Sequence, residues 1–124
     1  MSDLIEEMVK VEADARSFGF SYPDYKEIIK QIQSECAEVA ASIEQGESLA
    51  RQQEEIGDLI HAVIALCYHQ GFDVAQTMEQ ATHKFSNRMT ALKQVAKKRG
   101  LSNLEHLSLS ELLELWQEAK TSSN

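Results

Sequence analysis

Apolar residues recur every three or four positions through most of the chain, which is the period of an amphipathic α-helix. In the first segment Leu4, Met8, Val11 and Ala15 follow this spacing. Glycines and a single proline punctuate the pattern, and strand-like alternation is absent from the sequence. We therefore predict five helices, at about residues 3–17, 23–45, 48–70, 73–99 and 108–120.

Residues at the predicted boundaries have the properties of helix ends. Pro23 suits the first turn of the second helix, and Gly46 suits its C-terminal stop. Asp73 is a favourable N-cap for the fourth helix. Ser108 and Glu111 have the spacing of a capping box, which predicts the start of the fifth helix.

These helices predict an all-α fold, an antiparallel four-helix bundle with a short fifth C-terminal helix. The 124 residues match the size of one ordinary domain. We place a single helical domain over residues 1–120 and a frayed tail at 121–124.

Charge and composition narrow the classes of function. The formal net charge is −8, which disfavours binding to nucleic acid, although an acidic protein can handle polyphosphates through a divalent metal. The longest nearly apolar run, 61–68, is too short to span a membrane, and the acidic N-terminus does not resemble a signal peptide. Cys36 and Cys67 lie in helical patterns and are interpreted as reduced core residues, so a cytoplasmic location is expected.

Two consecutive predicted helices carry paired carboxylates. Glu35 and Glu38 form an E-x-x-E in the second helix, and Glu55 and Asp58 form an E-x-x-D in the third. A turn at Gly46 makes these helices antiparallel neighbours. Each pair flanks the apolar stripe of its own helix, on the same rotational side, so the two pairs can converge.

The third helix is apolar almost all round after its acidic pair. Its main stripe includes Ile56, Ile60 and Val63, while Ala62 and Ala65 lie on the opposite face. A helix of this kind packs on two sides, so its acidic flank is expected to point to a second packing surface. A close backbone contact at Gly57 would explain a glycine in the interior of this helix.

Four converging carboxylates repel one another unless some are protonated or a cation binds. All-oxygen ligands suit Mg²⁺, Mn²⁺ or Ca²⁺. The alternative is an ordinary acidic helix surface. A third interpretation starts from Asp58 and His61, whose D-x-x-H spacing resembles one half of a carboxylate-bridged di-iron site. The matching histidine would fall at position 41, which is Ala41.

The fourth predicted helix supplies a basic pair. Lys84 and Arg88 are four residues apart and share a helix face next to Phe85 and Met89. A lysine and an arginine beside a metal cluster can bind phosphate, whereas on their own they can simply pair with surface glutamates. Trp116 is expected in a core or a subunit contact, with lining of a base pocket as the alternative.

The segments "SECAEV", "EEIGDLIHAVIAL" and "KFSNRM" resemble, in this order, the signature of the MazG nucleoside triphosphate pyrophosphohydrolases. The resemblance extends to "GFSYPD" before the second helix and to "LSELLELWQEAK" at the C-terminal end. Phe20 and Tyr22 within "GFSYPD" are expected to pack in a turn, with stacking on a nucleobase as the alternative.

The resemblance implies an all-α bundle that assembles as a homodimer or homotetramer. It implies hydrolysis of a (d)NTP between the α and β phosphates, which gives a nucleoside monophosphate and pyrophosphate. The implied cofactor is Mg²⁺, or Mn²⁺ in its place. The implied site comprises the metal-binding Glu35, Glu38, Glu55 and Asp58, of which Glu35 and Glu38 are the candidate catalytic bases, and the phosphate-binding Lys84 and Arg88.

Three positions depart from the family pattern. Ser34 stands where a further glutamate is common, Thr82 replaces a common asparagine, and Lys93 replaces a common glutamate. The missing acid at position 34 favours an alternative interpretation: a catalytically weakened MazG-like module for nucleotide binding or oligomerisation. An assay for pyrophosphate release from (d)NTPs distinguishes an active enzyme from this alternative.

Overall fold

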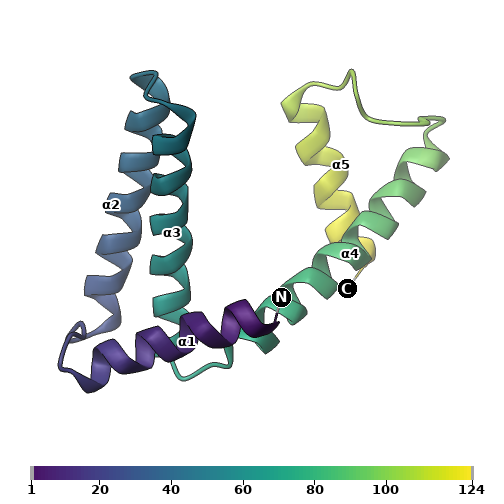
Figure 1. The fold of residues 1–124 in the computed structure, drawn as a ribbon. Coiled ribbons are helices and arrows are strands. Elements are labelled where there is room, and N and C mark those ends of the chain that lie inside the picture. Colours follow the sequence, from purple (N-terminus) through teal and green to yellow (C-terminus); the bar gives the residue numbers. More distant parts are fainter. Residues whose placement is uncertain (1, 124) are drawn as a thin grey trace. The chain divides into compact units, whose positions relative to one another are not determined.

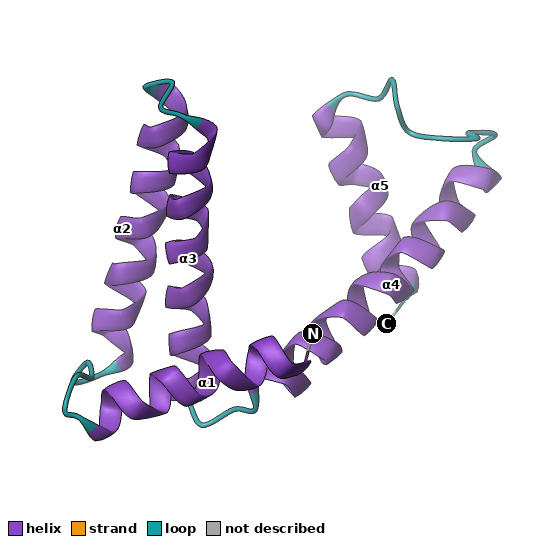
Figure 2. Ribbon diagram, viewed as in Figure 1, coloured by secondary structure: helices purple, strands orange, loops and turns teal. Residues whose placement is uncertain are grey.

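The computed structural model describes residues 2–123 and contains five helices within them (Figures 1 and 2). Strands are absent from this range. The all-α class is confirmed, and the fifth helix is the shortest, as predicted. The helices are α1 (Ser2–Ser17), α2 (Tyr25–Glu44), α3 (Leu49–His69), α4 (Val74–Lys98) and α5 (Leu109–Ser122).

Side-chain caps fix where most of these helices begin. Asp73 accepts a hydrogen bond from the Gln76 backbone N–H at 2.8 Å, and the capping box of Ser108 and Glu111 is formed, so both predicted caps are confirmed. The prediction for Pro23 was wrong. It lies just outside α2, because Asp24 is the N-cap and its side chain accepts from the backbone of the first turn.

The described residues form two compact units, one up to Thr77 and the other from Met78. In the first unit α2 and α3 lie side by side as an antiparallel hairpin, and α1 crosses the end where α2 begins and α3 ends (Figure 1). Arg16 fixes this crossing, since its Nη2 donates to the Ala65 carbonyl at 3.1 Å and its guanidinium lies over the Tyr68 ring.

The hairpin buries a different face of α3 from the one predicted as its main core. Ala62 and Ala65 are buried, whereas Ile56, Ile60 and Val63 are exposed in the described structure. Small side chains allow two helices to approach closely, which explains why α2 packs on the alanine side. Of the acidic pair on the flank of α3, Glu55 is buried in the hairpin, whereas Asp58 is exposed.

Two smaller predictions about this hairpin were wrong. Cys36 is exposed instead of buried in a core, although both cysteines are free thiols as expected. Gly57 has open space around it, because no described atom lies within 4 Å of the position of a Cβ. A close backbone contact within the described residues therefore does not account for this glycine.

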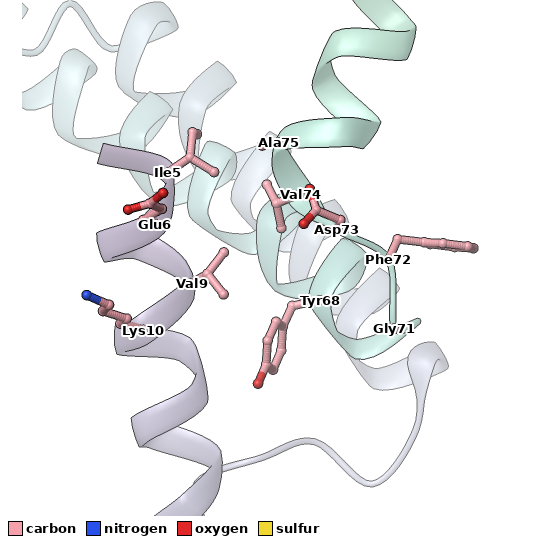
Figure 3. Close-up of a pocket in the computed structure, with 10 residues that line it drawn as sticks. All are labelled: Ile5, Glu6, Val9, Lys10, Tyr68, Gly71, Phe72, Asp73, Val74 and Ala75. Carbon is pink, nitrogen blue, oxygen red and sulfur yellow. The ribbon is translucent and has the colours of Figure 1, made fainter. Parts of the chain in front are cut away.

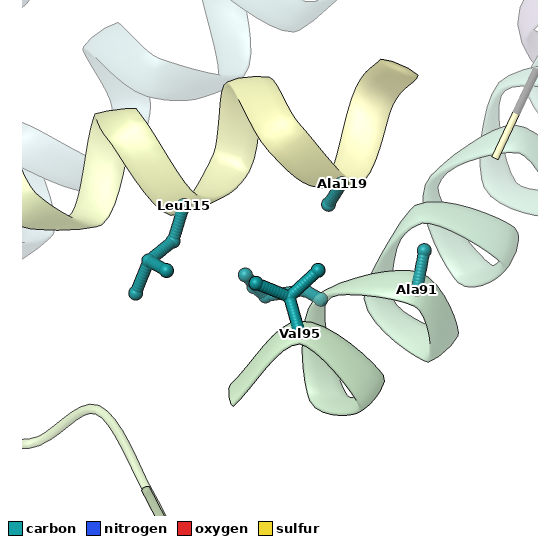
Figure 4. Close-up of a cluster of buried hydrophobic side chains, with 5 residues drawn as sticks. Ala91, Val95, Leu115 and Ala119 are labelled. Atoms are coloured by element: carbon teal, nitrogen blue, oxygen red, sulfur yellow. The ribbon is translucent and has the colours of Figure 1, made fainter. Parts of the chain in front are cut away.

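The second unit is held together by a core between α4 and α5 (Figure 4). Trp116 packs against this core, and its ring lies 5.6 Å from that of Phe85 between centroids, as expected for a core residue. α5 continues through Thr121 to Ser122, while residue 124 of the predicted tail lies outside the described residues. The buried members of the core are Ala91, Leu92, Val95, Leu115 and Ala119.

None of the helices found in residues 2–123 is both long and apolar enough to cross a bilayer.

Candidate metal centre

Three acidic side chains from the two helices of the hairpin meet at one point. Glu35 comes from α2, and Glu55 and Asp58 come from successive turns of α3. One carboxylate oxygen from each residue lies within 4.8 Å of the others. The hairpin thus brings together three of the four acids that the sequence singled out.

Burial makes this cluster different from an acidic surface. Glu35 and Glu55 are only 9% and 6% exposed, while Asp58 is open to solvent. The Oε1 atom of Glu35 accepts a hydrogen bond from Gln31 Nε2 at 2.7 Å, but its buried Oε2 has no hydrogen-bond partner among the described residues. A buried oxygen without a partner costs free energy, so a ligand that satisfied this oxygen would stabilise the site.

Electrostatics in the hairpin disfavour a charged Glu35. Burial raises the pKa of the Glu35 carboxyl above its ordinary value, and the neighbouring Glu38 carboxyl raises that pKa further. The hydrogen bond from Gln31 opposes this shift, and the charge of Asp58 adds to it. A cation bound at the cluster would reverse the balance, because it stabilises the ionised carboxylate.

The fourth acid, Glu38, lies beside the cluster instead of within it. Glu38 is exposed on α2, one turn beyond Glu35, and its carboxyl lies close enough to influence the pKa of Glu35. It is not a member of the three-residue group.

One cation of the protein already contacts the cluster. Arg51 Nη2 lies 2.6 Å from Glu55 Oε1, and the same guanidinium pairs with Glu54 and Glu47. The sequence analysis missed Arg51, although its spacing of four residues from Glu55 on one helix is a recognised signal for an ion pair. Arg51 therefore offsets part of the negative charge of the cluster.

The donor set of the cluster fits a hard divalent cation. All three groups offer carboxylate oxygens, and the buried Glu35 oxygen lacks another partner in the described part of the chain. His61 does not join them. Its Nε2 atom lies 3.5 Å from Glu12 Oε2, so the D-x-x-H of Asp58 and His61 does not form a mixed carboxylate and histidine cluster.

The predicted phosphate-binding residues both lie on α4, in the second unit. Lys84 is exposed and Arg88 is half-buried, one turn apart on the helix. The Nε atom of Arg88 is buried without a hydrogen-bond partner among residues 2–123. Arg88 thus retains a free donor, and the phosphate-binding role of the pair stays a prediction.

Two of the cavities that adjoin α1 differ in their relation to the acidic cluster. One, of about 240 Å³, shares Glu35 and Asp58 with the acidic cluster and extends towards α1 and the segment before α2. The other, of about 830 Å³, lies between α1 and the α3–α4 turn, where Figure 3 shows Val9 and Tyr68 facing each other. None of the predicted site residues lines this larger cavity.

The fold and site define an all-α protein with a partly buried carboxylate cluster shared by two helices. Comparison with known proteins specifies the class further. The MazG nucleotide pyrophosphohydrolase domain matches residues 24–92, more than half of the chain and the whole of the acidic hairpin. The chain therefore belongs to the MazG family, as its motifs indicated.

Two curated relatives are similar along most of the chain. They are the proteins named nucleoside triphosphate pyrophosphohydrolase from Escherichia coli strain K12 and from Escherichia coli O157:H7. Each is 26% identical to this chain over 112 residues, which cover 90% of the chain. The chain spans 42% of the length of these relatives.

Proposed function

We propose that this protein is a metal-dependent nucleotide pyrophosphohydrolase that cleaves (d)NTPs between the α and β phosphates. The observation that carries the proposal is the cluster of buried Glu35 and Glu55 with exposed Asp58, in which one Glu35 oxygen lacks a partner among the described residues. Membership of the MazG family and the names of the two relatives support the same reaction class.

Glu35, Glu55 and Asp58 would hold Mg²⁺, or Mn²⁺ in its place, through carboxylate oxygens. When bound, such an ion supplies charge neutralisation for the polyphosphate and lowers the pKa of a water molecule. Glu38, exposed beside Glu35, would accept the proton of the attacking water, with Glu35 as the other candidate. Lys84 and Arg88 would bind non-bridging phosphate oxygens.

The remaining expectations belong to the same proposal. The active form would be a homodimer or homotetramer in the cytoplasm, without nucleic acid as a partner. The second candidate function is a weakened module that binds nucleotides without turnover. Ser34, exposed on α2 next to Glu35, is the observation that favours it, since a glutamate is common there in the family.

The proposal is tested by release of pyrophosphate from a panel of (d)NTPs in the presence of Mg²⁺. Asp58→Asn should reduce kcat/KM by at least about 100-fold, because it removes a charged ligand while preserving shape. Glu44→Gln, an exposed acid at the end of α2, is the matched control and should keep the wild-type rate. Full activity of Asp58→Asn would refute the site, and a wild-type protein that releases no pyrophosphate would favour the module.

A further inference from the structure

We propose that the 240 Å³ cavity beside the acidic cluster holds the nucleobase, and that Glu12 on its wall selects bases with an exocyclic amino group. This inference rests on the proposed function and deepens it, since it assigns a substrate preference to the same site. The preferred substrates would be nucleotides of cytosine, adenine or guanine, and the disfavoured ones those of uracil and thymine.

The position of the cavity links it to the phosphate chemistry. Glu35 and Asp58 belong both to the acidic cluster and to the cavity wall. A substrate whose phosphates lie at these acids would direct its nucleoside into the adjoining space. A drug-sized ligand needs a pocket of about 300–1,000 Å³, so a cavity of 240 Å³ takes only one end of a nucleotide.

The lining of the cavity has the composition of a base-binding site. Val11, Ala15 and Ile28 provide apolar walls, and Phe20 and Tyr22 add aromatic rings from the segment between α1 and α2. Phe20 is 74% exposed, so the interpretation as a packed turn is wrong for this residue. An exposed ring at the edge of a cavity can stack on a planar base.

Glu12 presents a rigid acceptor on this wall. Its side chain is only 14% exposed, and Arg16 Nε donates to its Oε1 at 3.1 Å. Arg16 is itself fixed by its hydrogen bond to the Ala65 carbonyl and by its position over the Tyr68 ring. The other oxygen of Glu12, Oε2, lies 3.5 Å from His61 Nε2. The carboxylate is therefore held in place by Arg16 of α1 and His61 of α3.

Gln31 on the wall offers a further acceptor. It donates one N–H of its Nε2 to Glu35, which leaves its amide oxygen and its other N–H for a ligand. An ionised carboxylate can only accept, and an exocyclic amino group donates. Cytosine presents such an amino group where uracil presents a carbonyl oxygen, so a wall on which the Glu12 carboxylate can only accept favours cytosine over uracil. Other residues that line the cavity can either donate or accept, namely Ser21, Tyr22 and His61.

Cytidine and uridine nucleotides provide the sharpest test, because they differ chiefly in this one group. We expect the wild-type protein with Mg²⁺ to bind CMP at least about tenfold more tightly than UMP in calorimetry, with the same ratio in kcat/KM for CTP and UTP. Glu12→Gln should reduce this ratio to near one, since an amide can donate as well as accept. Glu7→Gln, an exposed acid on α1 outside the cavity, should leave the ratio unchanged.

Three outcomes would overturn the inference. The first is equal binding of CMP and UMP by the wild-type protein, and the second is an unchanged ratio in Glu12→Gln. The third is an equal loss of affinity for both nucleotides in Glu12→Gln together with a lower Tm, which would make Glu12 a structural residue only. Arg16→Lys distinguishes a structural role of Glu12 from a role in base selection, because this variant weakens the contact that holds Glu12 but keeps the Glu12 carboxylate. A protein that prefers CMP yet releases no pyrophosphate would refute the proposed function and support the cavity assignment.

Discussion

At the scale of single residues, Glu35 shows a conflict between stability and the proposed chemistry. It is buried in the hairpin next to other acids, and one of its oxygens lacks a partner in the described structure. A group in such a place destabilises the folded protein when it is ionised and unliganded. Its presence is explained if the cluster binds a cation.

Replacing this residue should therefore stabilise the metal-free protein. Burial raises the pKa of Glu35 in the folded state above the ordinary 4.5, so the folded form loses stability as pH rises from 4.5 through the raised pKa. Glu35→Gln keeps an acceptor for Gln31 but cannot ionise. We expect a higher Tm than wild type at pH 7 in EDTA, and a difference that disappears as pH falls towards 4.5.

Circular dichroism melts across this pH range would measure the effect, with Glu44→Gln as the control. A Glu35→Gln protein that melts below wild type at pH 7 would show that the ionised carboxylate is well satisfied without metal. The same variant should lose most of its affinity for Mg²⁺ in calorimetry, because one of three carboxylate ligands has been removed.

Gly57 offers a second test at this scale. With open space where a Cβ would be placed, Gly57→Ala should raise the free energy of unfolding by about 0.5–1 kcal/mol through helix propensity. Urea denaturation measures this change. A loss of stability, or of self-association, would mean that a surface of the assembled protein approaches α3 closely at Gly57.

At the scale of helices, the sequence predicted where a helix begins and ends more accurately than which face of it is buried. Caps such as Asp73 and Ser108 act through neighbouring residues, so local spacing was enough to find them. The buried face of α3 depends on what packs against it, and Ile60 proved exposed while Ala62 proved buried. Periodicity alone cannot distinguish two apolar faces of one helix.

The same reasoning explains which parts of the candidate site were found. Glu35, Glu55 and Asp58 were recognised from their spacing within two adjacent helices. Glu12 and Gln31 were missed as cavity residues, because α1 and α2 bring them to the cavity from separate parts of the chain. Their roles depend on the tertiary crossing of α1, which leaves no repeated spacing in the sequence.

The capping box of α5 makes a prediction at this scale. Ser108→Ala removes the acceptor for the Glu111 backbone N–H and should cost about 1 kcal/mol of stability. Ser110→Ala, at an exposed position inside the same helix, is the control and should be neutral or slightly stabilising. Urea titration of both variants gives the comparison. Equal stability of the two variants would show that the cap contributes nothing measurable.

At the scale of the whole molecule, the net charge of −8 disfavours the binding of a polyphosphate substrate. Acids and phosphates repel each other, so binding would require a cation between them. The MazG family and the acidic cluster were both predictable from the motif order, whereas the division into two compact units was not. That division depends on packing between distant segments.

Removal of divalent metal should accordingly abolish pyrophosphate release, and Mg²⁺ or Mn²⁺ should restore it. An ion that binds only the folded state at 100 times its Kd should also stabilise the protein by about 2.7 kcal/mol. Thermal melts with EDTA and with added Mg²⁺ measure this gain, and Asp58→Asn should show little of it. Metal-independent turnover would contradict the proposed chemistry.

The ion pair between Arg51 and Glu55 has a consequence for how the centre would respond to its surroundings. The guanidinium is tethered one helical turn away, so it competes for the Glu55 oxygen at a constant local concentration. A cation must displace this guanidinium from Glu55 before it can bind to all three carboxylates. Arg51 would thus set a minimum Mg²⁺ concentration for activity. Below that concentration Arg51 would partly neutralise the acids, and the protein would be inactive.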